Sequence, residues 1–146
     1  MTSTESNACC KLADLADELA RQPGISPREF ICQLGEKAAG IRPGLWRYLD
    51  LLKGGANPLP GSGFRPEFDD GSGGQTRHFA GIAVSCLLFG PKLTVWISEN
   101  IRRDPPTSPD GRLTLAATDF SQKLVKGQMP PGAAGQWIRD NLSNGC

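Results

Sequence analysis

The sequence predicts an all-α protein in which six to seven helices pack around one central apolar helix. Apolar residues recur at spacings of three and four in several separate segments, which is the period of one helix face. Proline and glycine separate these segments, and both residues end helices. No segment alternates between apolar and polar residues for long enough to indicate a β-strand.

The central helix is expected at residues 76–89. Nearly every residue from Phe79 to the end of this segment is apolar, so the helix has no polar face and must be covered by other helices or by lipid. Gly90 and Pro91 end it, because glycine tolerates a left-handed closing turn and proline cannot continue the hydrogen-bond ladder. The same break divides the apolar stretch 78–97 into pieces shorter than the ~20 residues of a spanning helix. Packed helices are therefore favoured over a membrane-active hairpin.

Three helices are expected before the central one. The first covers residues 8–22. The second has the clearest start, because Ser26 is a good N-cap, Pro27 suits the first helical position and Glu29 completes a capping box. The third follows from Pro43. The side chains expected in the core from these helices are Leu12, Leu15, Ala16, Leu19, Phe30, Ile31, Leu34, Ala38, Leu45, Trp46, Leu49 and Leu52.

Residues 54–75 are rich in glycine and proline and show neither a helical nor a strand period. A segment of this length without secondary structure is unusual in a compact domain, so it is either a linker or a lid over a site. Phe64 and Phe68 are apolar, which favours partial docking onto the rest of the protein.

Three further helices are expected after the central one. They cover residues 92–103, a segment that Ser108 caps and Gly127 ends, and a segment that begins at Pro130. The side chains expected in the core from these helices are Leu93, Trp96, Ile97, Ile101, Leu113, Ala116, Ala117, Phe120, Leu124, Ala134, Trp137, Ile138 and Leu142.

Length and charge limit the classes of protein. The 146 residues fit one helical domain over 1–146. The alternative is a division into N-terminal helices at 8–54, a loop at 55–75 and a helical core at 76–143. A formal net charge of +1 with interspersed signs gives no field that would favour nucleic acid or an anionic membrane. A protein partner or self-association is the interaction that remains.

The cysteines and the N-terminus bear on the compartment. The five cysteines show no paired metal spacing, and their odd number indicates reduced thiols rather than a disulfide framework. The first ten residues lack a charged region followed by an apolar run, so no secretory signal is predicted and the cytoplasm is the expected location. A single histidine argues against a zinc site, and neither a metal nor a cofactor is expected.

Four residues are candidates for an acid/base site. His78 begins the central helix, Glu99 lies near the end of the next helix, and Asp110 begins a third, so an antiparallel arrangement would bring them together. Arg77 carries a permanent charge that can bind an anionic group. Each residue also has a structural alternative, since His78 can hydrogen-bond inside the protein and a carboxylate such as Asp110 is favoured in a first helical turn. Arg77 further opens a narrow stripe of small side chains, at positions 81 and 85, that would let another helix approach closely.

The same residues support a weak resemblance over about residues 75–127. The order Arg77-His78, then Glu99, then Asp110 resembles a group of poorly characterised bacterial helical domains, some of which occur at the ends of polymorphic toxins. In that group an Arg-His pair is followed by His-Glu and by Asp-x-x-Asn-x-x-Gly. This chain departs from the pattern, because Ser98 replaces the second histidine and Leu113 stands in place of the asparagine.

Two main functions follow from these observations. The first is a non-catalytic helical module that binds another protein, because no motif demands chemistry. The second is a hydrolase-like effector in which His78 is the base, Arg77 binds an anionic group, and Glu99 or Asp110 orients the histidine. A membrane-active hairpin at 78–97 is a further alternative.

Overall fold

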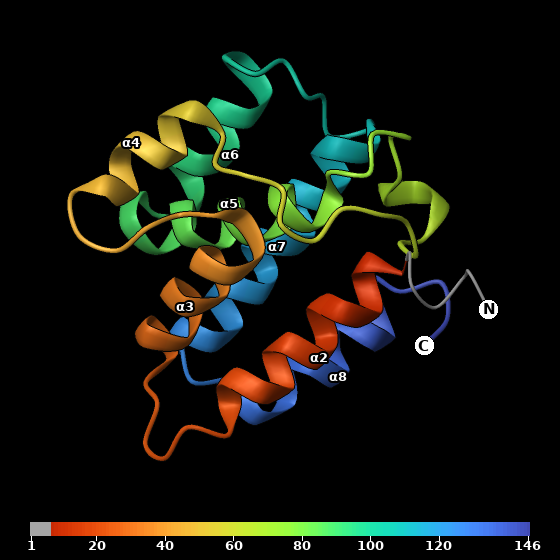
Figure 1. Cartoon of the computed structure of the whole chain (residues 1–146). Helices are drawn as coiled ribbons and strands as arrows, with labels where there is room; N and C mark the ends of the chain where they lie inside the picture. Colours follow the sequence, from red (N-terminus) through yellow and green to blue (C-terminus); the bar gives the residue numbers. More distant parts are fainter. Residues whose placement is uncertain (1–6) are drawn as a thin grey trace.

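The computed structural model describes residues 7–146 and is all-α over that range, as predicted (Figure 1). Residues 1–6, part of the segment in which a secretory signal was sought, lie outside the described residues. The elements are α2 (Ala8–Ala20), α3 (Pro27–Ala39), α4 (Trp46–Lys53), η1 (Pro66–Phe68), α5 (Gln75–Phe89), α6 (Pro91–Asn100), α7 (Pro109–Val125), η2 (Pro131–Ala133) and α8 (Ala134–Asn141). Ser26 and Ser108 cap α3 and α7 as predicted, whereas α4 begins three residues later than Pro43.

The central helix is α5, which packs against α3 on one side and α7 on another. Its side chains are mostly buried, as the prediction for residues 76–89 requires. Gly35 of α3 lies directly against Val84, where an added Cβ would collide with the valine side chain. On the other side, the rings of Phe79 and Phe120 lie 4.9 Å apart between centroids. Close backbone approach and aromatic packing therefore enclose two sides of α5.

A second pair of helices, α2 and α8, runs antiparallel beside this core (Figure 1). Gly135 lets the two backbones approach, because a Cβ there would meet the backbone of Ala13. Arg139 of α8 forms ion pairs with Asp14 and Asp17 of α2, at 2.8 and 2.6 Å. The pairing brings the start of α2 next to the end of the chain.

A disulfide between Cys10 and Cys146 links those two regions, with 5.7 Å between their Cα atoms. The prediction that all cysteines are reduced is therefore wrong. Sequence spacing gave no signal for the bond, because 136 positions separate the two residues and only the antiparallel packing of α2 and α8 brings them together. Cys9, Cys32 and Cys86 are free thiols.

The glycine- and proline-rich segment at 54–75 is docked against both chain ends. The N–H of Ala8 donates to the carbonyl of Ser62, and the N–H of Arg65 donates to the carbonyl of Leu142, each at 2.8 Å. Phe64 and Phe68 are buried, which confirms that their apolar side chains anchor the segment.

The predicted core side chains of α4 and of residues 92–103 are largely exposed. Leu45 and Leu52 expose 84% and 85% of their surface. The others that are at least two fifths exposed are Trp46, Leu49, Leu93, Trp96 and Ile101. The core prediction for these side chains is wrong, because a helical period identifies an apolar face but does not say whether another element covers it. No helix within residues 7–146 has both the length and the apolar character needed to cross a membrane.

Two leucine-to-alanine variants test this division between core and surface. Leu34 is fully buried, so Leu34→Ala is expected to lower the free energy of unfolding by about 2–5 kcal/mol. Leu49 is half exposed, so Leu49→Ala is expected to change it by less than about 0.5 kcal/mol. Urea denaturation measures both, and equal losses would contradict the exposed position of α4.

Reduction of the Cys10–Cys146 disulfide tests the linked ends. Because the bond closes almost the whole chain, its removal is expected to lower the free energy of unfolding by about 3–5 kcal/mol. Urea denaturation with and without reductant measures the loss, and Cys146→Ser should reproduce it without reductant. Cys32→Ser, at a free thiol, is the control and should leave the reductant effect unchanged. An oxidised and a reduced protein with the same midpoint would refute the linkage.

Candidate functional site

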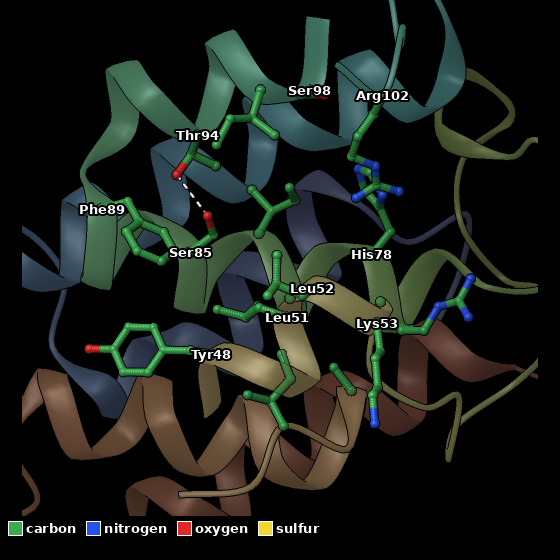
Figure 2. A pocket seen from close by; sticks show the side chains of 17 residues that line it. Tyr48, Leu51, Leu52, Lys53, His78, Ser85, Phe89, Thr94, Ser98 and Arg102 are labelled. Atoms are coloured by element: carbon green, nitrogen blue, oxygen red, sulfur yellow. Dashed lines mark hydrogen bonds between the residues drawn. The ribbon is translucent and has the colours of Figure 1, made fainter. Parts of the chain in front are cut away.

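A cavity of about 480 Å³ lies on the third side of α5, beneath α4 and beside α6 (Figure 2). We call it the α4–α5–α6 cavity. Its apolar wall consists of Ala39, Ile41, Tyr48, Leu51, Leu52, Ile82, Phe89 and Ile97. Its polar and charged side chains are Lys53, Arg77, His78, Ser85, Thr94, Ser98 and Arg102.

The two ends of the cavity differ in character. Lys53, His78 and Arg102 gather at the end near the start of α5, whereas Tyr48 and Phe89 lie at the opposite end (Figure 2). The Tyr48 and Phe89 rings are 6.1 Å apart between centroids. The lining is therefore basic at one end and aromatic at the other.

The stripe of small residues on α5 faces this cavity. Gly81 and Ser85 both line it, and Ser85 hydrogen-bonds to the buried Thr94 hydroxyl of α6 at 2.9 Å. The expectation that the stripe admits a closely packed helix is wrong at Gly81, where the nearest atom to an added Cβ is Ile41 Cδ1 at 3.9 Å. Small side chains here leave a space instead of filling it.

A bidentate ion pair holds α4 over the cavity. Both guanidinium nitrogens of Arg42 that face Asp50 donate to its carboxylate at 2.9–3.0 Å, and the backbone N–H of Arg42 donates to it at 2.8 Å. These hydrogen bonds lower the pKa of Asp50 to about 2. Arg42 also lies over the ring of Trp46, 4.6 Å from its centroid. The pair gives α4 a defined position although few of its side chains are buried.

His78 is held as a neutral side chain inside the protein. It is 9% exposed, and its Nε2 atom is 2.7 Å from the hydroxyl of Thr114, which in turn lies 3.2 Å from that of Ser98. Burial, with a smaller contribution from the charge of Arg102, lowers its pKa to about 4. At neutral pH the imidazole is thus uncharged and bonded to a hydroxyl rather than oriented by a carboxylate.

Asp110 lies near His78 but does not line the cavity. Burial raises its pKa to about 6, and a hydrogen bond and the negative charge of Asp70 add to the shift. Two carboxyl groups this close favour retention of a proton between them. Asp70 and Asp110 therefore form an acidic pair beside the basic end of the cavity.

Glu99 is not part of this arrangement. It is exposed and lies in a shallow groove on α6 with Lys92, Val95 and Trp96. The structure therefore brings Arg77 and His78 together in one cavity, places Asp110 near His78, and leaves Glu99 outside. Among residues 7–146 no group of three or more histidine, cysteine, aspartate or glutamate side chains is arranged to hold a metal ion.

Sequence reasoning missed Lys53, Arg102 and Thr114. Lys53 ends α4 and Arg102 follows α6, and basic residues at such positions are also favoured by the helix dipole alone. Arg102 forms an ion pair with Asp104, at 3.7 Å. The position of a helix end in the sequence gave no sign that these charges converge.

Comparison with known proteins adds no relative, because no family model, curated protein or solved structure matches this chain.

The shifted pKa values of His78 and Asp110 predict opposite effects of pH on stability. His78 titrates near 6.5 when unfolded and near 4 when folded, so the unfolded chain binds more protons in that window. The free energy of unfolding should therefore fall as the pH is lowered from 6.5 to 4, by an amount on the order of 3 kcal/mol. Asp110 has the reverse sign between pH 6 and 3.8, because its folded pKa is raised.

Asp110→Asn separates the two effects. At pH 7 it removes a charged carboxyl that folding disfavours, and we expect a gain of about 1 kcal/mol after allowance for screening of this part-exposed group. The gain should vanish near pH 4, where Asp110 is already protonated in the folded state. Urea denaturation at several pH values measures it, with Asp119→Asn on the same helix as the control. A loss of stability at pH 7 would contradict the raised pKa.

Proposed function

We propose that this protein is a non-catalytic helical module that binds another protein through the outer faces of α4 and α6. The observation that carries the proposal is that α4, α6 and the residues at their ends expose six large apolar side chains, which we call the α4–α6 surface: Leu45, Trp46, Leu49, Leu93, Trp96 and Ile101. Monomeric proteins rarely expose large apolar patches without a binding role. Two of the three tryptophans are half exposed on this surface, and tryptophan is enriched among the residues that dominate binding energy at interfaces.

The chemistry around His78 supports a binding role over catalysis. A general base needs a proton-accepting nitrogen directed at a substrate and a partner that orients it. The Nε2 atom of His78 is instead engaged by Thr114, and Glu99 lies on a different face of α6.

A hydrolase-like effector is the second candidate. It is favoured by one observation, that Arg77 and His78 both line the α4–α5–α6 cavity. In that function His78 is the base, Arg77 binds an anionic group, and Asp110 orients the histidine through a backbone hydrogen bond, whereas Glu99 lies too far outside the cavity to take this role.

The disulfide bears on the compartment in which the protein acts. A cytoplasmic location stays a prediction from the sequence. The Cys10–Cys146 disulfide weighs against it, because such bonds persist mainly in oxidising environments. An effector or a binding module that acts outside the reducing cytoplasm fits this bond better.

Leu49→Glu tests the binding proposal against a matched control. Leu49 exposes 46% of its surface on α4, and Leu115 exposes 44% on α7, away from the α4–α6 surface. We expect the wild-type protein to form a dimer in sedimentation or to retain a specific host protein on an affinity column. Leu49→Glu should abolish that association, whereas Leu115→Glu should preserve it.

Either of two results would contradict the proposal. The first is a wild-type protein that sediments as a monomer at every concentration and that retains the same proteins on the affinity column as Leu49→Glu does. The second is an equal loss of association in both variants, since that would indicate a general effect of added charge rather than a binding surface.

A further inference from the structure

The α4–α5–α6 cavity has the size and lining of a small-molecule site. Its volume of about 480 Å³ falls within the roughly 300–1,000 Å³ of ligand pockets, which combine a mostly apolar wall with a few polar groups. The lining side chains of α5 extend from Arg77 to Phe89, which corresponds to about 18 Å of helix axis at ~1.5 Å per residue. An elongated ligand suits this space better than a compact one.

The positive charge at one end of the cavity is only partly balanced by carboxylates of the protein, namely Asp104 and the Asp70–Asp110 pair. Arg77 forms no ion pair with any residue that the structure describes. Arg102 forms an ion pair with Asp104 at 3.7 Å, which is longer than a hydrogen bond, and Lys53 lines the same end. An anionic group placed there would meet several cationic side chains, and arginine is well suited to bind carboxylate or phosphate.

Gly81 supplies an independent observation. Glycine in a helix interior is destabilising relative to alanine, and an added Cβ at Gly81 would make only ordinary contact, with Ile41 at 3.9 Å. Gly35 is different, because a Cβ there would collide with Val84. Close helix packing therefore explains Gly35 but not Gly81. The effect of Gly81 is to keep the cavity open along α5.

We propose that the α4–α5–α6 cavity binds an elongated amphiphile with an anionic head group. The head group lies between Arg77 and Arg102, and the apolar body runs past Gly81 toward Phe89 and Tyr48. This site is distinct from the α4–α6 surface, because it lies beneath α4 and shares no side chain with that surface.

Three ligands with the same apolar chain test the head-group preference. Dodecanoate is anionic, dodecanol is neutral and dodecyltrimethylammonium is cationic, and titration calorimetry below the concentration of micelle formation measures their binding. We expect dodecanoate to bind at least about tenfold more tightly than dodecanol, which corresponds to one charge-assisted contact. The ammonium compound should bind more weakly than either. Dodecyl phosphate, tested alongside, identifies which anionic head group is preferred.

Variants of the cavity separate a specific site from adsorption to apolar surface. Arg77→Gln and Arg102→Gln should each weaken dodecanoate binding about tenfold and leave dodecanol binding unchanged. Arg112→Gln, an exposed arginine on α7 outside the cavity, is the control and should affect neither ligand. Gly81→Leu should abolish binding of both. Because that variant could also unfold the protein, Gly81→Ala is measured with it, and it should raise the melting temperature while weakening both ligands severalfold.

Three results would overturn this proposal. They are equal affinity for all three head groups, binding that is unchanged in the Gly81 variants, and the absence of saturable binding. Leu49→Glu keeps the outcome separate from that of the protein-binding proposal, because it should abolish protein association while leaving dodecanoate affinity unchanged.

Discussion

The structure depends on the burial of α5, a helix that is apolar on nearly every side. Such a helix cannot face water, so its neighbours must enclose it. Helix α3 covers one side through the Gly35 contact with Val84, and α7 covers another through the Phe79 and Phe120 rings. The third side carries the small residues Gly81 and Ser85 and faces the cavity, which is enclosed by α4, α6 and the end of α3. That side is where both the cavity and the exposed apolar surface occur.

The contacts that stabilise the fold and the surface proposed to bind a partner lie in different parts of the chain. Contacts between α2 and α8, the docked segment at 54–75 and the Cys10–Cys146 disulfide join the first described helix to the C-terminal residues. Helix α4 is attached by the hydrogen bonds of Asp50 to Arg42, by Leu51 against the core and by the ring contact of Tyr48 with Phe89 of α5. Because Asp50 is the one buried residue of α4, this helix leaves its outer side chains free for the proposed partner.

The predictable parts of the fold are those that local chemistry determines. Ser26 and Ser108 cap their helices because their hydroxyls accept backbone N–H groups at short range, and the apolar run in α5 requires burial wherever it lies. Coverage of an apolar face depends on contacts between distant segments, so the exposure of Leu45 was not predicted. The Cys10–Cys146 bond was missed for the same reason.

The candidate site was predicted in part. Arg77 and His78 were both predicted as site residues, and both line the cavity, although neighbouring residues on a helix do not face the same way. The convergence of Arg102 and the separation of Glu99 depend on how α6 is rotated about its axis, which spacing alone did not determine. Thr114, whose hydroxyl is the buried partner of His78, belongs to α7, and no local sequence pattern indicated this contact.

Hydrogen–deuterium exchange of the backbone amides tests the central claim most directly. If α5 is the sheltered axis of the protein, its amides should be among the slowest to exchange, close to the limit set by global unfolding. Those of α4, held over the cavity, should exchange by local opening at least about tenfold faster. Protection of α4 equal to that of α5 in the isolated monomer, or rapid exchange throughout α5, would contradict the account.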